Sequence, residues 1–157
     1  MQEITLAYKE MGLKGKLISQ IEMKCSGHLL YEHFKSNPHK TSSMSPDKIT
    51  NFTIHEGQLG KTNSVVSWNI ILGGKERHAK QVLYIDDEEK TITFNFNEGF
   101  MNEIYKSMTL TLTAEENLIT WTLVYEKLNE NTPEPLDFME FLIGLIKDLE
   151  THHVKVI

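Results

Sequence analysis

The chain has 157 residues, of which 39% are hydrophobic and 24% charged, and its 22 acidic and 16 basic side chains give a formal net charge of −6. A chain of this length suits one domain that buries about two thirds of its unfolded surface without disulfides or metals. The acidic balance opposes binding to nucleic acid and to anionic membranes, because both depend on basic side chains. We therefore expect no nucleic-acid partner.

Cys25 is the only cysteine in the sequence, so no intramolecular disulfide can form. A lone thiol fits a reducing compartment better than a secreted one. The first ten residues lack the basic start and the apolar core of a signal peptide, and no apolar run approaches the roughly 20 residues of a membrane span. These features predict a cytoplasmic protein that does not insert into membranes. For the oligomeric state we expect a monomer or a weak dimer.

Residues 1–10 are expected to form an N-terminal extension, followed by a single domain over residues 11–157. The domain begins with a predicted strand in which every second residue faces the same side, while polar or charged residues face the other. This alternation is typical of a half-buried strand. The inward set consists of Leu17, Ser19, Ile21 and Met23.

A short helical region is expected after this strand. Ser26 can cap a helix that runs through Phe34, and Asn37-Pro38 then ends it. The following stretch 39–48 is rich in Ser, Thr and Pro, and it predicts a loop or a broken helix. A second strand is predicted over residues 49–56.

Four further segments in the middle of the chain alternate between apolar and polar residues. Gly73-Gly74 is a tight hairpin signal that leads into the predicted strand 76–85, whose inward face the pattern leaves open. Short connections and two-sided alternation predict an antiparallel meander with one solvated face. The apolar faces of the four alternating segments are Val66, Trp68, Ile70 and Leu72, then Ile92, Phe94 and Phe96, then Met108, Leu110 and Leu112, and finally Ile119, Trp121, Leu123 and Tyr125.

The hydrophobic period changes near the C-terminus, where apolar residues recur at the i, i+3, i+4, i+7 and i+11 positions of a helix. This spacing predicts a helix of about 20 residues, roughly 30 Å long, with a broad apolar stripe. Pro135 and Asp137 suit its start, and His152 and His153 suit its end. The stripe consists of Phe138, Phe141, Leu142, Leu145 and Leu149.

Seven candidate strands, a short helical break and one long terminal helix predict an α+β domain. Because a single helix must cover one face of a large sheet, we expect a strongly curved sheet that wraps around it. Two interpretations of the interior stay open. The bulky aromatic residues either fill the core solidly, or they stand apart and leave an apolar ligand cavity, which in proteins typically measures about 300–1,000 Å³.

An ordered series of segments carries a family resemblance. It includes Ser45-Pro-Asp-Lys-Ile49, His55-Glu-Gly-Gln-Leu-Gly-Lys61, Trp121-Thr-Leu-Val-Tyr-Glu-Lys-Leu-Asn-Glu-Asn-Thr-Pro-Glu-Pro135 and Lys147-Asp-Leu-Glu-Thr-His-His153. From Met11 to about Lys155 the sequence resembles the plant-specific major latex protein family of the birch-pollen-allergen superfamily. The resemblance implies a helix-grip fold, in which a seven-stranded curved antiparallel sheet wraps around a long C-terminal helix, with two short helices after the first strand.

The resemblance also implies binding of a hydrophobic small molecule, such as a sterol, a lipid or a plant specialised metabolite, often in defence and without a cofactor. The alternative is a cofactor-independent enzyme that cyclises or isomerises a reactive terpenoid or alkaloid intermediate in the same cavity. The residues expected to contact the ligand are Tyr31, Trp68, Phe94, Phe96, Trp121, Leu123, Tyr125, Phe138, Phe141, Leu142 and Leu145.

Tyr125 is the candidate for chemistry. If its side chain faces inward, its hydroxyl lies among apolar groups and needs a hydrogen-bond partner. One interpretation is a structural hydrogen bond to the backbone. The other is that the hydroxyl orients a ligand or transfers a proton to a bound metabolite.

Two other motifs do not support a site. Gly57-Gln-Leu-Gly60-Lys61-Thr62 lacks the spacing of a phosphate-binding loop, and a strand rather than a helix is predicted after it. His152 and His153 are adjacent on a helix, so their side chains point about 100° apart, and no third ligand is spaced for zinc. We expect neither a metal site nor a cofactor.

Overall fold

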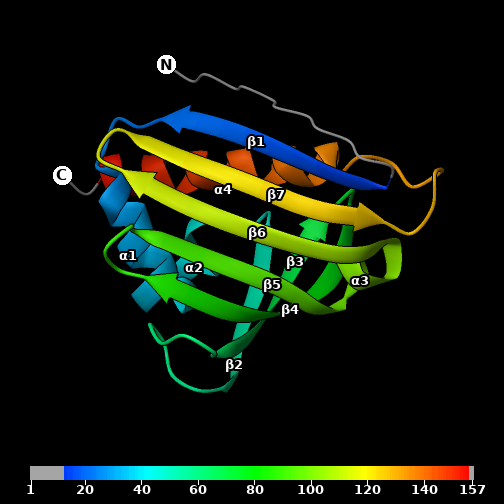
Figure 1. Ribbon diagram of the computed structural model, residues 1–157. Helices are drawn as coiled ribbons and strands as arrows, with labels where there is room; N and C mark the ends of the chain where they lie inside the picture. The colour runs from blue at the N-terminus through cyan, green and yellow to red at the C-terminus, as the bar shows by residue number, and fades with distance from the viewer. Residues whose placement is uncertain (1–12, 156–157) are drawn as a thin grey trace.

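The structure, a computed structural model, describes residues 13–155. The expected extension over residues 1–10 therefore lies outside the described part of the chain. The described residues form a seven-stranded antiparallel sheet with the order β1-β7-β6-β5-β4-β3-β2 (Figure 1). Its strands are β1 (Lys14–Glu22), β2 (Ile49–Glu56), β3 (Val65–Leu72), β4 (Lys75–Asp86), β5 (Thr91–Gly99), β6 (Tyr105–Glu115) and β7 (Leu118–Lys127).

Short helices occupy the two ends of the sheet. After β1 come α1 (Gly27–Ser36), the one-turn helix η1 (Pro38–Lys40) and α2 (Thr41–Met44), while α3 (Phe100–Ile104) joins β5 to β6. Ser26 caps α1 as expected, because its hydroxyl accepts a hydrogen bond from the His28 amide at 3.2 Å. The sequence did not predict α3, a single turn that starts after Gly99. At this residue the chain adopts φ 117°, a conformation that favours glycine.

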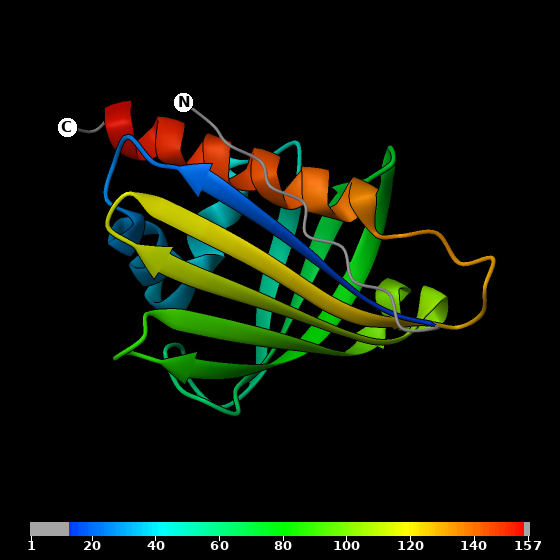
Figure 2. The same cartoon turned by 45° about the horizontal axis from the view of Figure 1, so that its top comes forward.

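The long terminal helix α4 (Leu136–Lys155) has 20 residues, in agreement with the predicted length. It lies across the concave side of the sheet, with α1 and α2 near its C-terminal end (Figure 2). The Trp121 indole Nε1 donates a hydrogen bond to the Leu142 carbonyl at 3.1 Å and ties β7 to the middle of the helix. The fold is thus the expected α+β helix-grip architecture. The buried face of α4 consists of Phe138, Met139, Leu142, Ile143, Leu145, Ile146 and Leu149.

The structure settles the inward face of β4, which the hydrophobic pattern left open. Ala79, Gln81 and Leu83 are buried against the core, whereas Tyr84, which points to the opposite face, is 55% exposed. β4 thus places an amide side chain on the apolar side of the sheet.

His33 is buried where α1 meets the C-terminal part of α4. Its ring nitrogen Nε2 is hydrogen-bonded to Thr41 Oγ1 at 2.7 Å, and its ring centroid lies 6.4 Å from that of His153. Burial, and then the nearby charges of His153, His152, His39 and Lys40, lower the pKa of His33 to about 4. Neutral His33 is therefore the form that the folded protein favours.

This shift makes the fold sensitive to acid. Because the pKa of His33 falls from an ordinary value near 6.5 to about 4 on folding, its contribution to stability is complete above pH 6.5 and is lost as the pH falls toward 4. The free energy of unfolding of the parent protein should fall between pH 7 and pH 4.5. In His33→Gln we expect this fall to be smaller by about 2–3 kcal/mol. Urea denaturation at the two pH values measures this difference. Equal losses in the variant and the parent protein would contradict it.

Gly27 is fixed by close backbone contact at the start of α1. Its amide donates to the Glu116 carbonyl at 2.8 Å, and an added Cβ would lie 2.0 Å from the Glu115 carbonyl oxygen. Since that neighbour is backbone, we expect Gly27→Ala to reduce the free energy of unfolding by about 2–3 kcal/mol in urea denaturation. Gly73→Asn is the control. Its φ of 63° in a hairpin turn suits asparagine, and nothing lies within 4 Å of an added Cβ. A similar loss in both variants would contradict this explanation.

Candidate functional site

A small apolar cavity lies between the concave face of the sheet and α4. Its volume is about 40 Å³. Eight of the residues expected to contact a ligand line it: Trp68, Phe94, Phe96, Trp121, Phe138, Phe141, Leu142 and Leu145. The rest of the lining is Phe34, Ile49, Ile70, Ala79, Gln81 and Leu110. The strands supply these residues from alternate positions, and the helix supplies them from its apolar stripe, so the predicted periodicities converge here.

The aromatic side chains fill most of this interior. The ring of Phe138 stacks on Phe141 at a centroid distance of 5.9 Å and meets the ring of Phe96 edge-to-face, also at 5.9 Å. Phe34 packs edge-to-face on Trp121 at 5.8 Å. The remaining volume exceeds the roughly 10–15 Å³ that one water needs but is well below the usual ligand cavity of about 300–1,000 Å³. The structure therefore has a nearly solid core with a residual cavity.

A second, larger pocket opens beside the first. It has a volume of about 190 Å³ and lies where α3, the β3–β4 hairpin and the start of α4 meet. Phe138 belongs to the lining of both spaces, so its ring forms a wall between them. The other residues of this side pocket are Leu72, Gly73, Arg77, Phe100, Met101, Ile104, Tyr105, Pro133, Glu134, Pro135 and Asp137.

The side pocket is more polar than the central cavity. The Arg77 guanidinium lies 5.6 Å from the centroid of the Phe100 ring, and its Nε donates to the Leu72 carbonyl. Tyr105 donates its hydroxyl hydrogen bond to the Pro133 carbonyl at 2.6 Å. Burial, followed by the charges of Glu134 and Asp137, raises the pKa of Tyr105 to about 12, so this phenol stays protonated.

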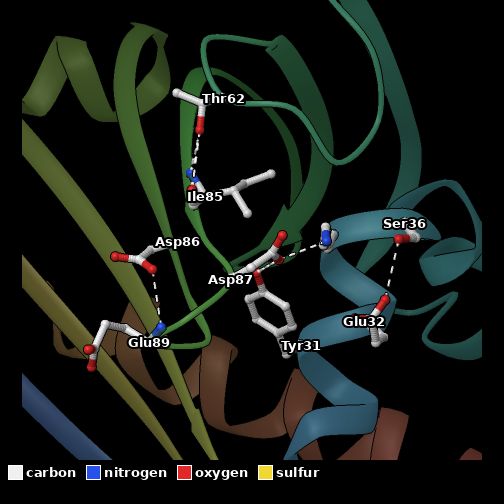
Figure 3. A network of polar contacts seen from close by, with 9 residues as sticks. Tyr31, Glu32, Ser36, Thr62, Ile85, Asp86, Asp87 and Glu89 are labelled. Atoms are coloured by element: carbon white, nitrogen blue, oxygen red, sulfur yellow. Dashed lines mark hydrogen bonds and ion pairs between the residues drawn. The ribbon is translucent and has the colours of Figure 1, made fainter.

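Tyr31, Leu123 and Tyr125 do not belong to the lining of the central cavity. Leu123 is fully buried in the sheet. The Tyr31 hydroxyl donates to Asp87 Oδ1 at 2.5 Å, and Figure 3 shows it pointing from α1 toward the β4–β5 turn. Lys35 Nζ binds the same carboxylate oxygen at 2.7 Å, and the hydrogen bonds from Lys35 and Tyr31 lower the pKa of Asp87. Tyr31 thus joins α1 to the sheet.

Tyr125 also faces inward, but its hydroxyl lies in a polar cluster. It donates to Glu134 Oε2, and the other carboxylate oxygen of Glu134 contacts Lys127 Nζ. A side-chain carboxylate is therefore a partner of the phenol, whereas one sequence interpretation expected a backbone group. Gly15 on the paired strand makes room for the ring, because a Cβ there would lie 2.5 Å from Tyr125.

Gln81 is the polar residue of the central cavity that sequence reasoning missed. It is 4% exposed, and its Oε1 has no hydrogen-bond partner within residues 13–155. The hairpin could have revealed it. The two-residue turn pairs Trp68 with Ala79 and Val66 with Gln81, and residues directly opposite each other in an antiparallel pair share a face. The inward Trp68 and Val66 therefore fix the inward direction of Gln81.

Within the part of the chain that the structure describes, no group of three or more His, Cys, Asp or Glu side chains could hold a metal ion. No helix in the same part is both long and apolar enough to cross a membrane.

Comparison with known proteins gives a consistent result. The model of the pathogenesis-related protein Bet v 1 family matches residues 12–156. MLP-like protein 43 of Arabidopsis thaliana is 33% identical over 147 residues, which cover 89% of this chain and 93% of that protein. The crystal structure of major latex-like protein 151 from Panax ginseng is 39% identical, with a TM-score of 0.88 over 90% of this chain and 99% of that one.

A norcoclaurine synthase from Thalictrum has a TM-score of 0.66 at 12% identity over 92% of this chain and 99% of that one, which shows a shared fold alone. The family model and the relatives of higher identity cover nearly all of the sequence, and they agree with the resemblance carried by its segments. The chain belongs to the Bet v 1 family of pathogenesis-related proteins, as one of its major latex protein-like members.

Proposed function

We propose that this protein binds a hydrophobic small molecule between the sheet and α4. The observation that carries the proposal is the lining of the central cavity, which consists almost entirely of aromatic and aliphatic side chains. Such a site gains affinity from apolar burial, at about 25 cal/mol per Å² before the entropy lost on association is subtracted. The ligand class is a sterol, a lipid or a plant specialised metabolite, and the family description supports a role in defence. We expect the protein to act in the cytoplasm.

Entry of a ligand requires a change in side-chain packing, because the central cavity holds only about 40 Å³. Phe138 is the group to move, since its ring alone belongs to both the central cavity and the 190 Å³ side pocket. Its ring contacts the rings of Phe96, Phe100 and Phe141, and such apolar contacts can be replaced by those of a ligand. A ligand that displaces the ring replaces these apolar contacts with its own, and the two spaces then become one.

The geometry supports a carrier, buffer or sensor better than an enzyme. Tyr125, the candidate for proton transfer, is absent from the lining of both pockets and donates to Glu134. A catalytic group must come within hydrogen-bond distance of the proton that it moves. A molecule held in the central cavity is therefore best regarded as bound rather than converted.

Phe141→Asp tests the position of the site. Phe141 lines the central cavity but is only partly buried, so a carboxylate there lowers stability less than at the fully buried Trp121. A charge facing the cavity opposes an apolar ligand. We expect the variant to bind Nile red, a neutral environment-sensitive dye, at least about tenfold more weakly than the parent protein in a fluorescence titration.

The matched control for this change is Leu136→Asp. It introduces the same charge on the same helix, at a position that is 45% exposed and lines neither pocket. Its dissociation constant for Nile red should equal that of the parent protein, while circular dichroism verifies that both variants are folded. Equal binding by Phe141→Asp and the parent protein would refute a site between the sheet and α4.

Phe138→Leu tests the route of entry. A smaller, non-aromatic side chain weakens the wall between the two pockets, so we expect the association rate of Nile red to rise several-fold in stopped-flow fluorescence. Phe100→Leu is the control, because Phe100 contacts the ring of Phe138 but lines the side pocket alone. If the two variants associate equally fast, Phe138 is not the wall that controls entry.

A further inference from the structure

We infer that Gln81 accepts a hydrogen bond from the bound molecule, and that the protein therefore selects apolar ligands that carry a hydroxyl or N–H group. This inference rests on the proposed function and specifies the ligand class of the same site. It comes from the one amide side chain in a lining that is otherwise aromatic and aliphatic.

The position of Gln81 in the sheet directs it toward the ligand site. On β4 it lies between Ala79 and Leu83 on the inward face, and its cross-strand partners are Val66 and Phe96. The sequence thus places a polar residue where the alternation calls for an apolar one. Such a break in the pattern, at the surface of a cavity, is typical of a group retained for function.

The Gln81 side chain has an unused acceptor. Only 4% of the side chain is exposed, and its Oε1 has no hydrogen-bond partner among the residues described. A buried carbonyl oxygen without a hydrogen bond is unfavourable, and native proteins hold few of them. The two other unpaired buried side-chain atoms of the described chain belong to Asn102 and His153, and neither residue lines the central cavity.

The local backbone is irregular at this point. In the pairing of β4 with β5, Lys80 lies opposite Glu98 and Gln81 opposite Phe96, so that Asn97 is left out of the ladder. A bulge of this kind bends the strand and re-aims nearby side chains, and bulges are common next to binding sites. The bulge therefore lies beside the one amide of the cavity.

The remaining chemistry of the cavity defines the preferred ligand. The other polar groups of the lining are the indoles of Trp68 and Trp121, which are donors only, and the Nε1 of Trp121 is already used by the Leu142 carbonyl. Gln81 Oε1 thus offers an acceptor that a ligand hydroxyl or N–H can satisfy and that an ether or a hydrocarbon cannot. A site with a buried polar group discriminates against the analogue that leaves this group unpaired.

The test compares two probes that differ in one donor. Naphthol carries a hydroxyl, whereas its methyl ether, methoxynaphthalene, has the same apolar body without a donor. Each probe is titrated against the complex with Nile red, and displacement gives its dissociation constant. We expect the parent protein to bind naphthol about tenfold more tightly than the ether. Since this ratio needs no variant, it tests the inference even where a substitution impairs folding.

Gln81→Met removes the amide at nearly constant size. We expect this variant to bind naphthol and the ether with about equal affinity. Leu83→Met is the matched control on the same face of the same strand, because Leu83 does not line the central cavity. It should keep the parent ratio. A merely structural role of Gln81 would change the affinities for both probes together and leave their ratio unchanged.

The outcomes separate this inference from the proposed function. If both probes displace Nile red with equal affinity in the parent protein, the apolar site stands and the role of Gln81 is refuted. An unchanged preference for naphthol in Gln81→Met would also refute it. If neither probe nor Nile red binds the parent protein, the proposed function fails and the inference fails with it.

Discussion

The apolar contact between α4 and the concave face of the sheet is the interaction on which the rest of the structure depends. The sheet is open, with β1 and β2 at its edges, and its inner face carries large side chains that would otherwise meet water. The 20-residue helix α4 packs on this face, and the hydrogen bond from Trp121 to the Leu142 carbonyl fixes its depth and position. The lining of the candidate site combines residues of the sheet with residues of this helix. The position of α4 therefore determines the size of the cavity.

The side chains of α4 and of the sheet leave only the small central cavity between them, so the packing of these side chains bears on ligand binding. Aromatic rings in the central layer hold one another by stacked and edge-to-face contacts, which are directional but individually weak. Under the proposed function, an apolar ligand replaces the ring contacts that it displaces. Binding then depends on the difference between ring–ring and ring–ligand packing. Under the proposed function, this Bet v 1 family member admits its ligand when the ring of Phe138, which lines both pockets, moves aside.

Sequence patterns predicted the elements that have strong periodicity. The strands with clean alternation, the second strand at Ile49–Glu56 and the terminal helix all have the expected positions, because burial of one face imposes a period of two or of 3.6 residues. The same two periods predicted which residues of the strands and of α4 face the central cavity. Four aromatic residues of the strands and four residues of α4 meet there as expected.

The pattern could not supply features that depend on contacts between distant segments. Tyr125 faces inward as predicted, but its partner Glu134 comes from the loop before α4, which has no period. Tyr31 is buried as well, yet its hydroxyl lies at the β4–β5 turn because Asp87 and Lys35 surround it there. The volume of the cavity depends on side-chain rotamers and on how closely α4 approaches the sheet. The alternation of apolar and polar residues predicts neither. The inward face of β4 was recoverable, but only by extending the pairing from the Gly73-Gly74 turn.

The central claim, that the gap between α4 and the sheet receives the ligand, is tested most directly by nuclear Overhauser effects between bound Nile red and the methyl groups of the protein. We expect contacts with the methyl groups of Ile70, Leu142 and Leu145, which line the central cavity from both layers. Contacts confined to exposed methyl groups, such as those of Val124 at 49% and Leu128 at 50% exposure, would show that the dye adheres to the surface and would contradict the claim.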